Sequence, residues 1–309
     1  MQIIQNFHNI DPKLQNSVLT IGNFDGIHLG HQEILNNAKI IASSENIKSA
    51  LLTFDPHPLK IIRPEKKFNR GLFSLSQKLD FLKEKDLVDA VFISQFDEKL
   101  ANLSAEDFVR EILVEKLKIK HLIIGYDFIF GKNRVGDANL LQKLAGIYNF
   151  SFHQIAAKRN HNDQVLSSTK IRNFIESGDL KSANKMLGRN YQICGTIIRG
   201  KQLARTIGFP TANFLPQKDL IKPKFGVYKA KVFVDKKDYS AILNFGIKPT
   251  FNGSEPLFEV HIFDFNQEIY DKEIVVELID FIREEKKFSG IEELKTQIQK
   301  DVKEVLNCE

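Results

Sequence analysis

The alternation of short apolar runs with helical patterns constrains the first half of this chain more than any other feature. Apolar runs typical of strands occupy residues 18–21, 50–54, 90–93, 121–124 and 150–155. Between them, apolar residues recur at the three- and four-residue spacing of amphipathic helices. Strands separated by helices in this way form a parallel sheet that is covered on both faces. The first half is therefore predicted to be a Rossmann-like α/β domain.

Local signals support three of the intervening helices. The first is predicted over residues 29–42. The second begins near Ser74, which forms a capping-box pair with Gln77 three residues later. The third begins at Ser104 and has an apolar face made of Phe108, Ile112 and Leu113. We expect these apolar faces to pack on the sheet.

A change of pattern marks a second domain. Two short helices are predicted over 169–176 and 180–187, with Gly178 and Gly188 just past their ends, where helices favour glycine. From residue 191 to residue 282 there are strand and turn signals without helical spacing. The clearest strands are 226–234, 239–245, 257–265 and 274–282. This pattern predicts an antiparallel β-barrel or β-sandwich, and two domains of residues 1–185 and 186–309.

One amphipathic helix is predicted to close the chain. Ser289 and Glu292 have the spacing of a capping box. The apolar residues of the helix fall on one face, made of Ile291, Leu294, Ile298, Val302 and Val305. We expect this terminal helix to pack on the barrel.

Composition excludes several classes of function. The formal net charge of +5 over 309 residues suits anionic phosphates but is too small and scattered to indicate nucleic-acid binding. Cys194 and Cys308 fit neither a metal site nor a disulfide framework. The N-terminal segment lacks the pattern of a signal peptide, and no stretch approaches ~18 consecutive apolar residues. We therefore expect a cytoplasmic protein without a membrane partner, as a monomer or weak homo-oligomer.

A phosphate site is predicted where the first of these strands ends. The strand runs into a glycine-containing turn and a helix opens directly afterwards, so backbone N–H groups and the positive end of the helix dipole meet there. The residues of the turn are Gly22, Asn23, Phe24, Asp25 and Gly26. His28 and His31 share a helix face and can donate hydrogen bonds to phosphate oxygens. A plain turn and a core histidine would explain single pieces, but not the whole string at this place.

Three further strings accompany this turn. Residues 53–58 follow the second strand and residues 125–137 follow the fourth. The string at 167–172 combines hydroxyls that can cap a helix with basic side chains that can meet phosphate. Taken alone, these are ordinary turns and an ordinary helix start. The glycines at 125 and 131 do not form a P-loop, because five residues separate them and Asn133 stands where Ser or Thr is required.

In series, the strings resemble the nucleotidyltransferase superfamily. Residues 22–31 resemble its HxGH motif, residues 167–172 its second signature, and residues 20–31 its FAD synthetase branch. The resemblance implies adenylyl transfer, in which the FMN phosphate attacks the α-phosphate of ATP and pyrophosphate leaves, with His28 and His31 on the transferring phosphate. It implies ATP-binding residues Gly22, Asn23, Phe24, Asp25, Ser168, Thr169 and Arg172. It also implies flavin-binding residues Asp55, Pro56, His57, Pro58 and Asp127.

A second set of polar residues lies in the β-rich half. Thr211 and Asn213 are two apart on an extended segment, so their oxygens can face the same way and suit Mg²⁺. Glu259 lies on a strand whose other face is apolar, with Phe258, Val260 and Ile262. A carboxylate there is uncommon unless it is exposed or functional. By composition alone, a turn stiffened by Pro210 and a solvated Glu259 would explain both features.

These residues resemble the riboflavin kinase family, by its PTAN motif at 210–213 and its FxR…KF segment at 281–288. The resemblance implies that Glu259 is the catalytic base for the ribityl 5′-hydroxyl of riboflavin, with Mg²⁺ on Thr211 and Asn213. Arg283 is implied to stack on or hydrogen-bond the flavin, the alternative being a surface ion pair with Glu284 or Glu285. The implied ATP-binding residues are Gly200, Lys201, Gly208, Pro210 and Thr211.

The resemblance covers residues 15–305 and implies a bacterial-type bifunctional enzyme that converts riboflavin to FMN and FMN to FAD, with ATP for each step. Three residues depart from the family pattern, Ala204, Lys248 and Asp271, where Gly, Arg and Gly are usual. Lys248 loses any bidentate contact, and Asp271 carries a cost if its φ is positive.

Other interpretations are an adenylyltransferase whose barrel is kinase-inactive and only binds flavin, and an adenylyltransferase for another phosphate acceptor. A third is a non-enzymatic flavin- or RNA-binding regulator. The presence of Thr211, Asn213 and Glu259 argues against a kinase-inactive barrel. An adenylyltransferase for another acceptor would leave the barrel without a role, which argues against the second interpretation. The barrel sequence lacks the arginine–aromatic strip of RNA-binding sheets, which argues against the third.

Overall fold

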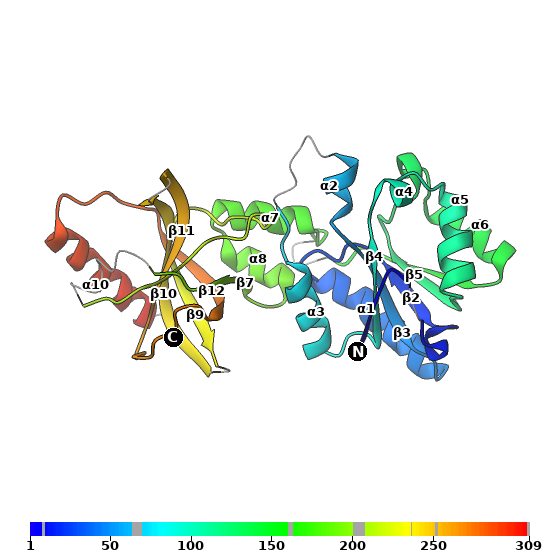
Figure 1. The fold of residues 1–309 in the computed structure, drawn as a ribbon, viewed down its shortest axis with the longest axis horizontal. Helices are drawn as coiled ribbons and strands as arrows, with labels where there is room; N and C mark the ends of the chain where they lie inside the picture. Colours follow the sequence, from blue (N-terminus) through cyan, green and yellow to red (C-terminus); the bar gives the residue numbers. More distant parts are fainter. Residues whose placement is uncertain are drawn as a thin grey trace. The chain divides into compact units, whose positions relative to one another are not determined.

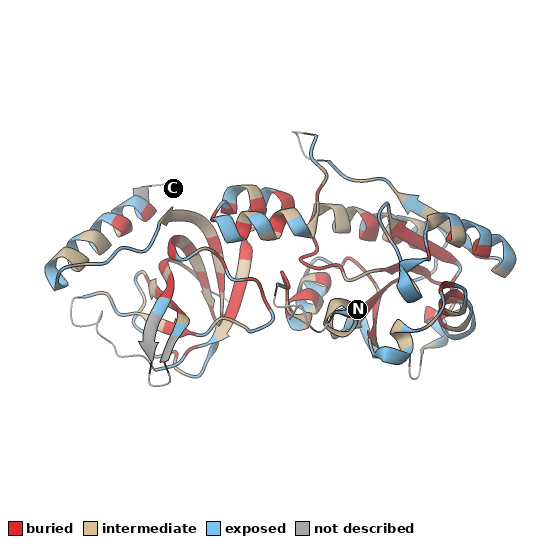
Figure 2. Ribbon diagram, turned by 90° about the horizontal axis from the view of Figure 1, so that it is seen from above, coloured by how far each residue is buried: buried red, intermediate tan, exposed pale blue. Residues whose placement is uncertain are grey.

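The chain folds into two compact units (Figure 1). The computed structural model describes residues 1–7, 10–63, 70–159, 163–199, 208–235, 237–250 and 253–307. Contacts group these residues into Met1–Ser168 and Thr169–Glu309. In each unit the buried residues gather along the strands (Figure 2). Among the described residues, no helix combines the length and apolar character needed to span a bilayer.

A six-stranded parallel sheet forms the centre of the first unit, in the order β1-β4-β3-β2-β5-β6. The strands are β1 (Gln2–Gln5), β2 (Val18–Ile21), β3 (Ser49–Asp55), β4 (Ala90–Gln95), β5 (His121–Gly125) and β6 (Ser151–Ile155). The last five are the strands expected from the apolar runs, and β1 was not expected. The strand order reverses between β2 and β5, and open α/β sheets bind ligands at the carboxyl ends of the strands at such a position.

Helices cover both faces of this sheet, which confirms the predicted fold class. Consecutive residues along a strand point to opposite faces of the sheet. Leu19 and Leu122 pack with the π-helix η3 (Phe108–Lys116) and α6 (Ala138–Tyr148). Val18 and Ile123 pack with α1 (Leu29–Ser44) and α3 (Leu75–Glu84). The shorter helices are η1 (Pro12–Leu14), α2 (Pro58–Ile62), α4 (Glu98–Ala101), α5 (Ala105–Asp107) and η4 (Lys132–Arg134).

The helix starts predicted at Ser74 and Ser104 are confirmed. The amide of Gln77 donates to Ser74 Oγ at 3.2 Å, and the amide of Ser74 donates to Gln77 Oε1 at 3.0 Å, which is the predicted capping box. Ser104 caps α5 through the amide of Asp107 at 3.0 Å. The helix predicted from Ser104 continues with π-type winding from Phe108 onward, a geometry that periodicity did not indicate.

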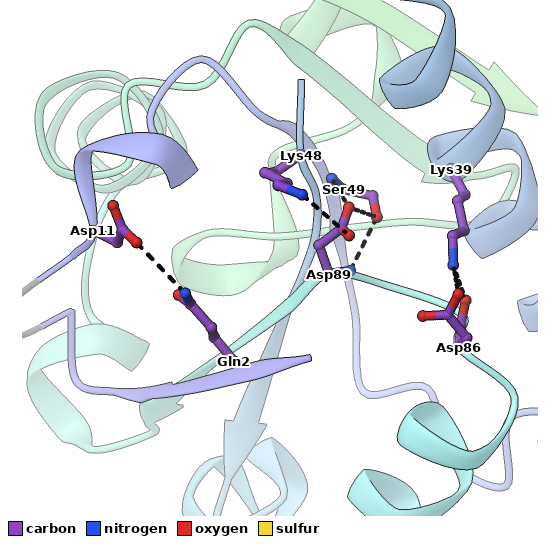
Figure 3. Close-up of polar contacts among 7 residues, drawn as sticks. All are labelled: Gln2, Asp11, Lys39, Lys48, Ser49, Asp86 and Asp89. Carbon is purple, nitrogen blue, oxygen red and sulfur yellow. Dashed lines mark hydrogen bonds and ion pairs between the residues drawn. The ribbon is translucent and has the colours of Figure 1, made fainter. Parts of the chain in front are cut away.

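The amino ends of β3 and β4 are tied together by a small polar cluster (Figure 3). The amide and hydroxyl of Ser49 each donate to Asp89 Oδ2 at 2.9 Å, and the amide of Asp89 donates to Ser49 Oγ at 3.1 Å. Lys39 and Asp86 form a separate pair nearby (Figure 3). Because the strands are parallel, this cluster lies at the opposite end of the strands from the turn after β2, and it stabilises the sheet away from the candidate site.

Two helices open the second unit, α7 (Ser168–Ser177) and α8 (Leu180–Leu187). As predicted, Gly178 and Gly188 follow them with φ of +87° and +74°. Asn184 of α8 donates to the carbonyl of Leu278 at 3.1 Å and accepts from the amide of Tyr191 at 2.8 Å. These bonds join α8 to the β-sheet that follows. The domain boundary placed near residue 186 stays a prediction, while the contacts divide the chain after Ser168.

The second unit is a curled antiparallel sheet of order β7-β12-β9-β10-β11-β8. The strands are β7 (Tyr191–Thr196), β8 (Ala212–Phe214), β9 (Gly226–Val234), β10 (Lys237–Thr250), β11 (Gly253–Ile262) and β12 (Glu273–Arg283). Beyond β7, the amide of Ile198 donates to the carbonyl of Asn213 in β8 at 2.7 Å. The two edges of the sheet therefore approach each other, which confirms the predicted antiparallel barrel. Phe258, Val260 and Ile262 are buried, as predicted.

The terminal helix α10 (Ile291–Asn307) packs on the barrel, where Val305 is buried with Val227 and Ile242. Two details of its prediction were wrong. The amide and hydroxyl of Ser289 donate to Glu293, at 2.9 and 2.8 Å, and Glu292 does not take this role. Ile291 is 65% exposed instead of joining the apolar face. The helix begins at residue 291, so the third helical position, which reaches back to the start, is residue 293.

Candidate active sites

The turn after β2 is held in a strained conformation by buried side chains. Phe24 and Ile27 have φ of +46° and +35°, although neither is glycine, and both are almost fully buried. A Cβ atom at Gly22 would lie 3.0 Å from the ring of Phe24, so a larger residue there would require that ring to move. Backbone strain of this kind persists only where the surrounding structure imposes it, and it clusters at functional sites. The turn lies at the carboxyl end of β2, at the position where the strand order reverses.

The structure brings His28 and His31 together at the start of α1. His28 is the N-cap, and its Nδ1 accepts from the amides of Gly30 and His31 at 3.2 and 3.3 Å. A ring nitrogen that accepts hydrogen bonds carries no proton, so the neutral ring has its proton on Nε2. The two imidazoles stack with centroids 3.7 Å apart, and the His31 ring packs 4.8 Å from that of Phe24. The pair is thus preorganised at a helix N-terminus, where phosphate binds well.

Asp25 ties the turn to two later segments. It is buried, and its Oδ1 accepts from the amides of Leu72 and Phe73 at 2.8 and 3.2 Å. Its carbonyl accepts from Ser168 Oγ at 2.9 Å. The structure therefore brings the first signature string into contact with the second through Ser168. Thr169 and Arg172 follow on α7, in the second unit, and the ATP-binding roles expected for them rest on the sequence.

Sequence reasoning missed a buried lysine beside the turn. Lys78 of α3 is 7% exposed, and its Nζ donates to the Asn23 carbonyl at 2.7 Å and to Thr53 Oγ1 at 3.1 Å. Burial lowers the pKa of Lys78 to about 8, although the charges of Asp25 and Asp55 act in the opposite direction. A lysine in an amphipathic helix is usually solvated, so its type gave no signal. The one signal in the sequence was its position, four residues before the buried Leu82 and therefore on the apolar face of the helix.

The two loops expected on the flavin side begin at the same edge of the sheet. Asp55 ends β3 and is exposed, and His57 caps α2 by accepting from the amide of Leu59 at 3.2 Å, with Pro58 as the first helical residue. Asp127 follows β5 and is also exposed. Because β3 and β5 flank β2, both loops begin beside the turn that follows β2.

In the second unit, strand pairing assembles the candidate kinase residues. Glu259 of β11 lies directly opposite Asn213 of β8 on one side and Asn244 of β10 on the other. Asn244 Nδ2 donates to Glu259 Oε2 at 3.4 Å, an interaction that sequence reasoning did not foresee. Asn213 is 5% exposed, and its Oδ1 has no hydrogen-bond partner among the described residues. A buried amide oxygen left without a donor fits a hard cation such as Mg²⁺.

A cavity of about 600 Å³ is lined by sequence neighbours of these residues, Ala212 and Val260 among them. Its walls include Arg199, Thr211, Ile262 and Tyr270, and the Arg199 guanidinium lies 4.9 Å from the centre of the Tyr270 ring. The sequence indicated Thr211 but not the wall formed by residues 265–270. A cavity of this size, with an aromatic ring, a cation and hydroxyl oxygen, suits a nucleotide.

A histidine fixes the loop that carries Thr211. His261 Nδ1 lies 2.8 Å from the carbonyl of Pro210. A carbonyl can only accept, so Nδ1 carries the proton and donates it. His261 is two residues from Glu259 on β11, so both side chains share a face of the strand. Strand β11 therefore carries the candidate base Glu259 and, through His261, also fixes the loop that contains Thr211.

The structure describes only some of the other residues expected at the kinase site. Gly200, Lys201 and Ala204 lie outside the described residues, as does the side chain of Lys248. Gly208 is exposed with φ of +91°. Asp271 has φ of +61°, so the position does require the left-handed conformation that makes Asp costlier than Gly.

Arg283 has a buried partner. Its Nε donates to Asp301 Oδ1 at 2.9 Å and its Nη2 donates to Asp301 Oδ2 at 2.7 Å, and Asp301 is 2% exposed. Its Nη1 donates to the carbonyl of Glu284 at 2.9 Å. The surface ion pair considered with Glu284 or Glu285 is therefore replaced by a bidentate pair that anchors α10 to the end of β12.

Comparison with known proteins assigns each half of the chain to a class of enzyme. Residues 10–170 match the family model of FAD synthetase, and residues 187–308 match that of riboflavin kinase. Both classes act on flavins, and their order along the chain is the order of the two sites described above.

Full-length relatives give the particular family. A bifunctional riboflavin kinase/FMN adenylyltransferase from Haemophilus influenzae is 40% identical over 98% of this chain and 97% of its own length. One from Buchnera aphidicola is 39% identical, with the same coverage. A crystal structure described as a macrolide-efflux protein from Streptococcus pneumoniae has a TM-score of 0.89, with 30% identity and 99% of both chains covered. The chain belongs to the bifunctional riboflavin kinase/FMN adenylyltransferase family.

Proposed function

We propose that this protein makes FAD from riboflavin in two steps, each with its own ATP and its own site. The second unit phosphorylates riboflavin to FMN, and the first transfers AMP to FMN with release of pyrophosphate. The observation that carries the proposal is that both family matches occur in one chain, and the proximity of two pairs of residues supports it. His28 stacks on His31 in one unit, and Glu259 lies opposite Asn213 in the other.

In adenylyl transfer, the work is positioning and charge stabilisation, because no covalent enzyme intermediate is needed. The α-phosphate of ATP would lie at the start of α1, where backbone amides and the Nε2–H of His28 meet the charge that develops on its oxygens. We propose Gly22, Asn23, Phe24, Asp25, His31, Ser168, Thr169 and Arg172 as the remaining ATP contacts. The loop of Asp55, Pro56, His57 and Pro58, together with Asp127, would hold FMN.

In the kinase step, Glu259 takes the proton from the ribityl 5′-hydroxyl as that oxygen attacks the γ-phosphate of ATP, whose bond to the bridging oxygen breaks to release ADP. Asn244 holds the carboxylate in place. Mg²⁺, when bound by Thr211 and Asn213, offsets phosphate charge. Gly200, Lys201, Gly208 and Pro210 are proposed to complete the ATP site. The Nε and Nη2 of Arg283 are engaged by Asp301, so the flavin contact proposed for this residue is stacking.

The interpretation in which the barrel is kinase-inactive receives no support. The riboflavin kinase model matches residues 187–308, and the relatives are named for both activities. We also propose that the protein acts in the cytoplasm, without nucleic-acid or membrane partners, as a monomer or weak homo-oligomer.

A chromatographic time course of the purified chain with riboflavin, ATP and Mg²⁺ tests the proposal. FMN followed by FAD is the expected result. If riboflavin is untouched while added FMN becomes FAD, the departures at Ala204, Lys248 and Asp271 have removed the kinase activity. If neither product forms, the proposed function is wrong.

A further inference from the structure

Lys78 places a charge where the fold alone does not require one. It lies on the buried side of α3, at a helical position where an apolar residue would pack without penalty. Burying an ammonium group costs several kcal/mol unless its surroundings compensate. Among the described residues, no carboxylate forms an ion pair with it, and the charges that favour its protonated form, on Asp25 and Asp55, act at longer range. A costly group of this kind beside a candidate active site indicates a functional role.

The contacts of Lys78 join the ends of two strands at the site. Asn23 follows β2 and Thr53 lies near the end of β3, and both accept hydrogen bonds from the Nζ atom, at 2.7 and 3.1 Å. The C=O and N–H of a trans peptide point in opposite directions. With the Asn23 carbonyl turned to Lys78, the amide of Phe24 must point away from it. Lys78 therefore sets the orientation of a peptide inside the strained turn that leads to His28.

We propose that Lys78 is a positioning residue of the adenylyltransferase site, whose ammonium group holds the turn between β2 and α1 in the conformation that aims its amides and His28 at the transferring phosphate. This inference rests on the proposed function of the first unit. Lys78 acts through Asn23 and the turn, and it needs no contact with substrate.

A charged positioning role predicts a pH dependence that a packing role does not. The pKa of Lys78 is lowered to about 8, so the group is charged below that pH and neutral above it. FAD formation should therefore fall as pH rises through about 8, because the neutral amine holds the carbonyl less firmly. Asp25 and Asp55 are the charged groups that act on Lys78. Phosphate groups with pKa near ~6 are already ionised near pH 8.

The test compares Lys78→Met, which keeps length and removes charge, with Lys78→Arg, which keeps charge above pH 10. Lys83→Met is the matched control, because Lys83 is exposed on the same helix. FAD formation from FMN and ATP is measured from pH 6.5 to 9.5. Circular dichroism and thermal unfolding of each variant are the control for folding, and FMN formation by the same preparation is the control for the second unit. Since a misplaced site can lose ~10²-fold, Lys78→Met should lose about that factor in kcat below pH 8 and should lose the alkaline fall. Lys78→Arg should recover most of the rate, without the fall near pH 8.

The outcomes separate the two hypotheses. If the unchanged chain forms no FAD from FMN, the proposed function fails. If it forms FAD while Lys78→Met keeps the full rate, or the same alkaline fall, only the positioning role is overturned. Should Lys78→Met fail to fold, Lys78→Arg decides: an alkaline fall still centred near pH 8 in that variant contradicts the proposal.

Discussion

The two candidate sites are built from different parts of the polypeptide. In the first unit, the proposed phosphate-binding part of the site is one continuous turn at the end of β2, and backbone amides and the start of α1 would supply much of its chemistry. In the second unit, the site is a set of side chains displayed from the neighbouring strands β8, β11 and β10. The first depends on the conformation of a few consecutive residues, and the second depends on register between strands distant in sequence. We therefore expect substitutions in the two units to differ in which activity they reduce and in how far they affect stability.

Replacing the candidate base should give the largest effect and should be confined to one activity. Glu259→Gln keeps the size of the side chain and its hydrogen bond to Asn244 but removes the proton acceptor. We expect FMN formation to fall by about 10²–10⁴-fold, the usual contribution of a general base, while added FMN is converted to FAD at the normal rate. Loss of both activities in this variant would contradict two independent sites.

The reciprocal variant should lose slightly less. His28→Asn retains a side-chain oxygen that can cap α1, since Asn is a favoured N-cap, but it lacks the donor at Nε2. We expect FAD formation to fall by about 10²–10³-fold, as for loss of one transition-state donor, with FMN formation preserved. His28→Ala removes the cap as well, so it should also lower the stability of the first unit by about 1 kcal/mol. Equal thermal stability of the two variants would show that the cap contributes nothing.

Removing the ion pair beneath α10 should affect stability in the second unit only. Arg283→Met leaves Asp301 buried without its partner, which costs about 3–5 kcal/mol for a buried pair. Denaturant unfolding followed by circular dichroism would measure this loss, and FAD formation from FMN should persist at denaturant concentrations that abolish FMN formation. A rise in the KM for riboflavin without loss of stability would instead assign Arg283 mainly to flavin binding.

The smallest effect is expected far from either site. Asp86 is 80% exposed and pairs with Lys39 at the edge of the first unit (Figure 3). Pairs of this kind contribute about 0.2–1 kcal/mol. Asp86→Asn should shift the unfolding midpoint only slightly, leave both activities intact, and lose even this shift in high salt. A larger effect would mean that this edge of the sheet is coupled to the site.

The same contrast explains what could be predicted from the sequence. β2 is buried at every position, so its apolar run predicted it directly, whereas β1 has exposed residues at all positions except Ile4 and escaped notice. The turn from Gly22 to His31 was predicted as a unit because its residues are consecutive. The Asn244–Glu259 contact and the cavity wall at 265–270 were not, because each depends on how separate strands and loops meet.

The ring of His28 serves the fold with one nitrogen and, in the proposed mechanism, the reaction with the other. A substitute would need an acceptor near the backbone to begin α1 and a donor farther out, on a rigid frame, to reach the phosphate. Asparagine has the acceptor without the reach, and lysine or arginine has the reach without the acceptor. Two unrelated demands therefore converge on one position, and histidine is the side chain that meets both.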